Sequence, residues 1–240
     1  MRTSGKILWI VIGAAVLAMA AVMVAGRIAV GWSFVPEADG ASRHPRRRDR
    51  GPVESMSPDL SGFDGILVEG EWTVDVRQAG GHAVDISFPD AMSDWIVVET
   101  EGRTLVLSCV VPDCTDSGLE AHIGMPSLAG ITVSGAADIG ISGFHEDRVD
   151  FVVEGAANII AEDSSAGRVS VRLDGIGNVD LSDMTAEDAR VDIGGAGWVK
   201  LAMDGGVLEG SLDGMGRIYY SGDVSAERVT IDGLGKVKRK

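Results

Sequence analysis

The sequence predicts an all-β protein: a right-handed parallel β-helix, or β-solenoid, with coils of about 20 residues behind one N-terminal transmembrane helix. Three observations lead to this fold class. The 240 residues include 33 glycines, roughly twice the usual share of about 7%. A glycine motif recurs at near-constant spacing in the C-terminal half, and an uncharged apolar segment lies near the N-terminus. The 45% hydrophobic content excludes a disordered acidic chain, and the lack of a Gly-X-Y period excludes collagen.

The first element is the apolar segment ILWIVIGAAVLAMAAVMVAG, residues 7–26, which Lys6 and Arg27 flank. Its 20 uncharged residues are about what a helix needs to cross the roughly 30 Å hydrocarbon core of a bilayer. We therefore expect a transmembrane signal-anchor over residues 1–27. A cleaved signal peptide is the alternative, because AMA at residues 18–20 fits the small-x-small cleavage rule, although the apolar segment continues past that site.

The charges around this segment predict its orientation. Arg2 and Lys6 precede it and favour an N-terminus inside the cell. Arginines also follow it, but most of them lie at or beyond the distance over which the positive-inside rule operates. We expect a single-pass protein of the cell membrane that contacts the membrane through this helix and carries its main domain outside the cytoplasm, in the periplasm.

Residues 28–58 have the composition of an extended tether. Residues 36–58 hold four of the seven prolines and five arginines, with almost no large apolar side chain. The arginines could contact anionic lipid or cell-wall polymer, or simply keep the tether solvated. Residues 1–58 contain 8 Lys and Arg against 4 Asp and Glu (+4), whereas residues 59–240 contain 13 against 32 (−19). An acidic main domain repels phosphate backbones, so nucleic acid is not an expected partner.

Residues 59–127 are expected to form N-terminal β coils or a cap. ILVEGEWTVDV places alternating apolar residues around Gly70, so a first coil is expected there. Three further strands are predicted at Ala83–Phe88, Trp95–Thr100 and Leu105–Val110, with turn residues between them. A cap is needed because the end of a solenoid otherwise exposes its interior.

Residues 128–240 contain the regular repeat. Its six motifs are spaced at 20, 20, 20, 19 and 19 residues. They are GAADI from Gly135, GAANI from Gly155, GIGNV from Gly175, GAGWV from Gly195, GMGRI from Gly214 and GLGKV from Gly233. Apolar residues alternate with polar ones on both sides of each motif, as in half-buried strands. Each repeat is therefore expected to form a strand, a Gly-x-small corner, a second strand and a looser polar connection.

Stacking explains the period and the glycines. Coils stacked about 4.8 Å apart would align equivalent apolar side chains into one continuous interior. A helical solenoid would need longer units, and a calcium-binding β-roll would need tandem Asp-bearing motifs. The first glycine of each motif, the lead glycine, is expected to permit positive φ or a close backbone approach. These motifs do not predict a nucleotide site, because strands lie on both sides of each one.

The segment LSGFDGILVEGEWTVDV, from Leu60 to Val76, the ending GRTLVLS, and the serial SGAADI, EGAANI, DGIGNV, GGAGWV and DGMGRIYYSG motifs carry a resemblance to a known family. Over roughly residues 60–238 the chain resembles the bacterial cell-envelope family "putative autotransporter adhesin, head GIN domain". The resemblance implies a β-helical extracytoplasmic domain behind a signal or anchor. The Arg-rich tether and the cysteine pair depart from the family pattern, so the resemblance implies no role for them.

One candidate for catalysis is the column of residues directly before the lead glycines. It consists of Ser134, Glu154, Asp174, Gly194, Asp213 and Asp232. Carboxylates about 5 Å apart on neighbouring coils would approach the separation used by retaining glycosidases. Gly194 interrupts the column, however, and acidic strand ends also keep a solenoid soluble. We therefore expect no catalytic residues and keep a glycan-active enzyme as the alternative.

The candidate ligand-binding residues lie three positions after successive lead glycines. They are Asn158, Asn178, Trp198 and Arg217, between Asp138 and Lys236 in the same series. The two asparagines could form a hydrogen-bonded ladder. Trp198, with Arg217 beside it, could stack on sugar rings. Exposed corner residues without a ligand are the plainer interpretation, because single surface aromatics are common.

Cysteine and histidine spacing bears on the remaining chemistry. Cys109 and Cys114 enclose four residues, and outside the cytoplasm such a pair is typical of a local disulfide. A zinc site would need two more ligands. The four histidines are scattered, without i, i+4 pairs or a neighbouring nucleophile motif, so neither a metal site nor a catalytic triad is expected. No cofactor is expected.

These features together favour a non-enzymatic cell-envelope protein. Its rigid β-solenoid would bind or adhere to polysaccharide, cell wall or protein. Two alternatives remain: a glycan-active enzyme that uses the stacked carboxylates, and a purely structural envelope spacer.

Overall fold

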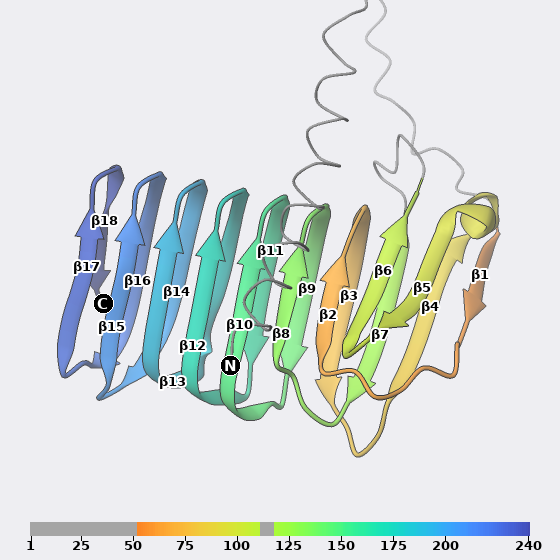
Figure 1. Ribbon diagram of the computed structural model, residues 1–240, viewed down its shortest axis with the longest axis horizontal. Helices are drawn as coiled ribbons and strands as arrows, with labels where there is room; N and C mark the ends of the chain where they lie inside the picture. Colours follow the sequence, from red (N-terminus) through yellow and green to blue (C-terminus); the bar gives the residue numbers. More distant parts are fainter. Residues whose placement is uncertain (1–51, 111–117) are drawn as a thin grey trace, which may run out of the picture. The chain divides into compact units, whose positions relative to one another are not determined.

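The computed structural model describes residues 52–110 and 118–240, which form an all-β solenoid (Figure 1). The expected anchor, residues 1–27, lies outside the described residues. Within them, no helix has the length and apolar character needed to cross a bilayer. The strands, with the 3₁₀ helix η1 (Asp90–Trp95), are β1 (Val53–Met56), β2 (Gly65–Val68), β3 (Glu71–Gln78), β4 (Ala83–Pro89), β5 (Ile96–Glu101), β6 (Thr104–Cys109), β7 (Leu119–Met125), β8 (Gly130–Val133), β9 (Ala136–Ser142), β10 (His145–Val153), β11 (Ala156–Glu162), β12 (Ser164–Leu173), β13 (Ile176–Ile193), β14 (Ala196–Asp204), β15 (Val207–Leu212), β16 (Met215–Asp223), β17 (Ala226–Ile231) and β18 (Leu234–Arg239).

The regular coils follow the predicted period. Each coil gives one strand to each of two parallel stacks. The first sheet contains β8, β10, β12, the second half of β13, β15 and β17. The second sheet contains β9, β11, the first half of β13, β14, β16 and β18. Equivalent residues pair at an offset of 20 residues up to β14 and of 19 from there on, which confirms the β-solenoid.

The interior is built from the apolar columns that the repeat predicted. In the first sheet Val153, Leu173 and Ile193 are neighbours on successive coils, and all three are fully buried. The second sheet faces them with an equivalent column, which includes Ile159 and Val179. Because each coil covers the apolar residues of the next, two strands per repeat suffice to build a core.

The lead glycines turn the chain between the two sheets where backbones of adjacent coils approach closely. A Cβ placed on Gly155 would overlap the carbonyl oxygen of Gly135 in the preceding coil. The N–H groups of Glu154 and Gly155 both donate to the carbonyl oxygen of Val133, at 2.9 and 3.1 Å. None of the six lead glycines has positive φ. Of the two reasons predicted for these glycines, close approach is therefore the one that operates.

The polar connections opposite the glycine corner are more ordered than the sequence indicated. Residues 182–190, expected to be a looser polar connection, belong to the continuous 18-residue strand β13. Met184 and Ala186 point inward and are 1% and 0% exposed. Ser164, in the preceding coil, accepts a hydrogen bond from the N–H of Phe144 at 3.2 Å and donates one to the Glu162 carbonyl at 2.7 Å. A few small and apolar residues in this otherwise polar stretch therefore point inward and cover the core on this side of the solenoid.

The N-terminal region adds two coils in a non-sequential order. Strand β2 pairs in parallel with β6 on one side and β8 on the other, and β3 pairs likewise with β7 and β9. The first coil therefore lies between two later ones. The strands predicted near 83–88, 95–100 and 105–110 are present as β4, β5 and β6.

Antiparallel strands cap this end of the solenoid (Figure 1). Strand β5 covers the outer edge of β6, β4 covers the outer edge of β7, and β1 pairs with β4. One boundary is corrected here: Val53–Met56 was assigned to the tether, residues 28–58, because of its composition, but it forms β1 and pairs with Ile86–Pro89. A short polar strand has little periodic signal, and only its partner β4 defines it.

The opposite end of the described chain carries β17 and β18, each of which pairs with a neighbouring coil on one side only. Leu234 is 75% exposed there, and Arg239 occupies the inward position beside Tyr220. Charged groups on an edge strand, including inward ones, hinder edge-to-edge pairing with other chains.

We predict that Gly155→Ala destabilises the solenoid by several kcal/mol, because the added methyl group collides with backbone and not with a movable side chain. Gly80→Ala is the matched control, since a Cβ at Gly80 meets nothing within 4 Å. Chemical denaturation followed by circular dichroism measures both. Equal stability of the two variants would show that the corner can relax.

We also predict uneven local stability along the solenoid. Backbone amides in β17 and β18, whose side chains are mostly exposed, should exchange hydrogen much faster than those in β12 and β13. Hydrogen–deuterium exchange with mass spectrometry measures this. Uniform protection from β12 to β18 would contradict the predicted fraying at this end.

Candidate functional site

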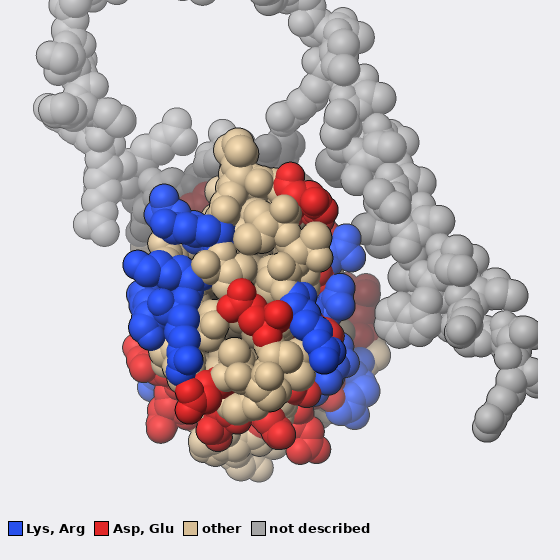
Figure 2. Space-filling model, turned by 90° about the vertical axis from the view of Figure 1, so that its left-hand side faces the viewer, with Lys and Arg blue, Asp and Glu red and all other residues tan. Residues whose placement is uncertain are grey.

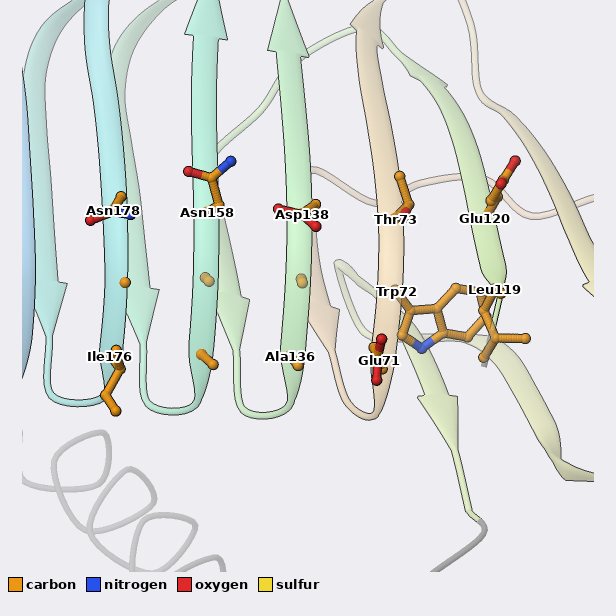
Figure 3. Close-up of a pocket in the computed structure, with 15 residues that line it drawn as sticks. Glu71, Trp72, Thr73, Leu119, Glu120, Ala136, Asp138, Asn158, Ile176 and Asn178 are labelled. Atoms are coloured by element: carbon orange, nitrogen blue, oxygen red, sulfur yellow. The ribbon is translucent and has the colours of Figure 1, made fainter. Parts of the chain in front are cut away.

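A groove of about 460 Å³ runs along the glycine corner of the second sheet (Figure 3). It crosses the strands β7, β3, β9, β11 and β13, so segments far apart in the sequence build it. The residues that line it are Glu71, Trp72, Thr73, Gly118, Leu119, Glu120, Ala136, Ala137, Asp138, Ala156, Ala157, Asn158, Ile176, Gly177 and Asn178.

Small residues create this groove. At the second and third motif positions the coils carry Ala136, Ala137, Ala156, Ala157 and Gly177, so little side-chain volume stands above the corner. At Gly177 no side chain fits at all, because a Cβ there would collide with the carbonyl oxygen of Ala157. The same steric limit that lets the coils stack therefore leaves a channel along the outside.

Trp72 gives the groove an aromatic element. It lies beside Leu119 and Ala137 in the strand register and is only 2% exposed. Its indole N–H donates to the carbonyl oxygen of Glu69 at 3.0 Å, which fixes the ring. The sequence placed Trp72 in the first coil but did not indicate this site. Its neighbour in the register, Leu119, belongs to β7, a strand that the sequence did not predict.

One wall of the groove is a row of polar side chains on adjacent strands. Figure 3 shows Asn178, Asn158, Asp138, Thr73 and Glu120 side by side, in agreement with the register. The sequence raised a hydrogen-bonded ladder between Asn158 and Asn178, and the structure bears out their neighbouring positions in this wall but not the hydrogen bond. In the described part of the chain no hydrogen bond joins their side chains, so each amide can meet a ligand.

A second groove, about 500 Å³, continues along the same corner over the later coils. Ile176 lines both grooves. Ile176, Met215 and Leu234 are 68%, 60% and 75% exposed, although they are large and apolar. They occupy the same motif position as Ala136 and Ala156, so the corner carries an apolar strip along its length.

The other two predicted binding residues continue the polar row beyond the first groove. Trp198 lies beside Asn178, and Arg217 lies beside Trp198. The Nζ of Lys200 lies 4.3 Å from the centroid of the Trp198 ring and 2.5 Å from a carboxylate oxygen of Asp180. Partial burial raises the pKa of Asp180, but hydrogen bonds from Lys200 and from Ser182 outweigh this effect and leave the pKa below its ordinary value.

Arg217 also contacts the next strand position. Its guanidinium donates to the phenolic oxygen of Tyr219 at 3.4 Å. This hydrogen bond lowers the pKa of Tyr219, and the charges of Arg217, Lys236 and Lys238 act in the same direction. The sequence had placed Lys236 in the same series as Arg217, but it had not linked Lys238 to the site.

Part of the carboxylate column lines the second groove. Asp174 and Asp213 both line the second groove, but Gly194 lies between them. Asp174 forms an ion pair with Arg172 at 2.6 Å, and Asp213 accepts a hydrogen bond from the Ser211 hydroxyl at 3.0 Å. Neighbouring side chains therefore already engage both carboxylates.

Two further expectations concern cysteine and metal chemistry. Cys109 is disulfide-bonded, while its expected partner Cys114 lies outside the described residues, so the pairing stays a prediction. Residues 52–110 and 118–240 contain no group of three or more His, Cys, Asp or Glu side chains that could hold a metal ion.

A solved structure supports the fold. A crystal structure described as a putative adhesin from Bacteroides fragilis is similar with a TM-score of 0.60 at 19% sequence identity, and the match covers 79% of this chain and 97% of that chain. Another described in the same words, from Parabacteroides distasonis, has a TM-score of 0.49 at 15% identity and covers 78% and 98%. At such identity the first likeness shows the fold alone. Among curated proteins, none matches this sequence.

A family model gives the closer relationship. The model described as "Putative auto-transporter adhesin, head GIN domain" matches residues 62–184, from just before β2 into β13. The resemblance in sequence was expected to extend to about residue 238, and the coils do continue with the same pairing to β18. Since the match spans more than half of the 240 residues, this protein belongs to the putative auto-transporter adhesin, head GIN domain family.

Proposed function

We propose that this protein is a non-enzymatic cell-envelope protein whose rigid solenoid binds polysaccharide, cell wall or another protein. The observation that carries the proposal is the groove along the glycine corner, with its polar wall of Asp138, Asn158 and Asn178. The adhesin description of the family and of the similar crystal structures supports a binding role.

The groove is suited to an extended ligand because it repeats with the coils. Equivalent groups recur about every 4.8 Å along the solenoid, so a polymer lying in the groove can make the same contact several times. Strand backbone holds these groups, which keeps the ordering cost of binding low. Amide and carboxylate side chains beside an apolar strip match the hydroxyl groups and C–H faces of sugars.

The remaining parts of the proposal concern location and architecture. The apolar segment 7–26 would act as a single-pass anchor, and the tether would carry the solenoid away from the membrane on the periplasmic side. We also propose that the coils wind in the right-handed sense, as parallel crossover connections generally do.

The second candidate function is a glycan-active enzyme, and Asp174 and Asp213 in the second groove are the observation that favours it. A hydrolase would release reducing ends from envelope polysaccharide, and Asp174→Asn would abolish that release. Binding without product release supports the adhesive role. If no envelope fraction binds the purified chain, a structural spacer becomes the better description.

We predict that Ala156→Trp, which fills the exposed part of the groove, weakens binding to cell-envelope polysaccharide by about tenfold or more without unfolding the protein. Glycan-array binding of the full chain in detergent measures the effect. Ile160→Trp is the control, since Ile160 is on the same strand, 42% exposed, and outside the groove. Equal losses in both variants would place the binding surface elsewhere.

A further inference from the structure

The outer face of the second sheet changes sign along the solenoid. One row of outward residues, taken from strand to strand, runs Glu120, Thr73, Asp138, Asn158, Asn178, Trp198, Arg217 and Lys236. The parallel row two residues further on ends in Lys200, Tyr219 and Lys238. A domain with a net charge of −19 over residues 59–240 therefore carries cations together at one end of one face.

We name this end of the face the basic surface and define it by Arg217, Tyr219, Lys236, Lys238 and Lys240. Figure 2 looks onto this end of the solenoid and shows Lys and Arg side chains gathered in a column along one edge. Arg217 and Lys236 are direct neighbours in the register, as are Tyr219 and Lys238. Lys240 places its Nζ 5.1 Å from the centroid of the Tyr219 ring.

The cations of the basic surface have no carboxylate partners, unlike all the other described Lys and Arg residues except Arg228. On the first sheet, Arg148, Arg172 and Arg190 pair with Asp150, Asp174 and Asp192 at 2.6 to 2.9 Å. Within the described residues, no carboxylate lies within ion-pair distance of the four cations of the basic surface.

Unpaired neighbouring cations repel one another. Like charges directly opposite on adjacent strands are destabilising. The pKa of Tyr219 is lowered first by the hydrogen bond from Arg217, and the positive charges of Arg217, Lys236 and Lys238 lower it further. A bound anion would remove this repulsion and would make charge-assisted hydrogen bonds to Arg217 and the lysines.

From this geometry we propose that the basic surface binds an anionic polysaccharide through its carboxylate or sulfate groups. This proposal rests on the proposed adhesive function and names its ligand class. Trp198 and Tyr219 lie among the cations, and aromatic rings offer stacking faces for sugars. The cations lie on coils about 4.8 Å apart, a distance on the scale of one sugar unit.

The sign change along the face favours a flexible chain over a flat partner. An anionic bilayer lying against this sheet would meet the basic surface and also Glu120, Asp75 and Asp138 at the other end. A flexible polysaccharide can contact the basic surface alone and leave the acidic end in solvent. The same consideration disfavours a stiff DNA duplex, which the net negative charge also repels.

The test uses the full chain in a neutral detergent, with trigalacturonate as the anionic probe and its methyl ester as the uncharged probe. Isothermal titration calorimetry at low and at physiological salt measures both affinities. We expect trigalacturonate to bind, the ester to bind at least about tenfold more weakly, and added salt to weaken the binding of trigalacturonate.

Charge-matched triple variants locate the site. Arg217→Gln with Lys236→Gln and Lys238→Gln should weaken trigalacturonate binding by about tenfold or more. The control, Arg148→Gln with Arg172→Gln and Arg190→Gln, removes the same charge from the first sheet and should change the affinity by less than about twofold. Circular dichroism verifies that both variants fold.

Three outcomes would overturn the inference: no binding of trigalacturonate, equal effects of the two triple variants, or stronger binding to phosphatidylglycerol vesicles that the basic-surface variant abolishes. A different result tests the proposed adhesive function. If neutral envelope glycans still bind and Ala156→Trp reduces that binding, the groove has its function and only the anionic ligand class is wrong.

Discussion

The rest of the structure depends on the close approach of one coil to the next at the glycine corner. The lead glycine of each coil contacts the carbonyl oxygen of the lead glycine before it, at a distance that excludes a Cβ. This contact sets the stacking distance and aligns Val153, Leu173 and Ile193 into a buried column. Because every coil is positioned only by its neighbours, the constraint must be repeated in each one, and the glycine content follows from that repetition.

The same constraint shapes the outer surface. Glycine is required at the lead position, and alanine or glycine follows it in most of the coils under the first groove, so a channel lies along the corner. The outward residue three positions after each lead glycine forms its wall. That outward position carries no packing requirement. It holds Asp138, Asn158 and Asn178 in the groove and then Trp198 and Arg217 beyond it. The scaffold therefore fixes where functional side chains stand, while their chemistry is free to change from coil to coil.

The two ends of the solenoid solve the exposed-edge problem differently. At the β7 end, antiparallel strands cover the edges and the chain doubles back across its first coil. At the β18 end, charged residues on the last strand discourage pairing instead. The cations there therefore have two compatible roles: they protect an edge strand, and they form the surface to which we assign an anionic ligand.

The sequence by itself determined the fold of the regular coils, because their contacts repeat with a period that is visible in one chain. It also determined that Asn158, Asn178, Trp198 and Arg217 share a row, since the parallel register keeps motif positions together. Only the tertiary structure decided the order of the N-terminal coils and brought Trp72 and Leu119 together in the lining of the groove. It also decided which cations lack carboxylate partners. Those features depend on pairing between non-repeating segments and on side-chain geometry, and neither produces a periodic pattern in the sequence.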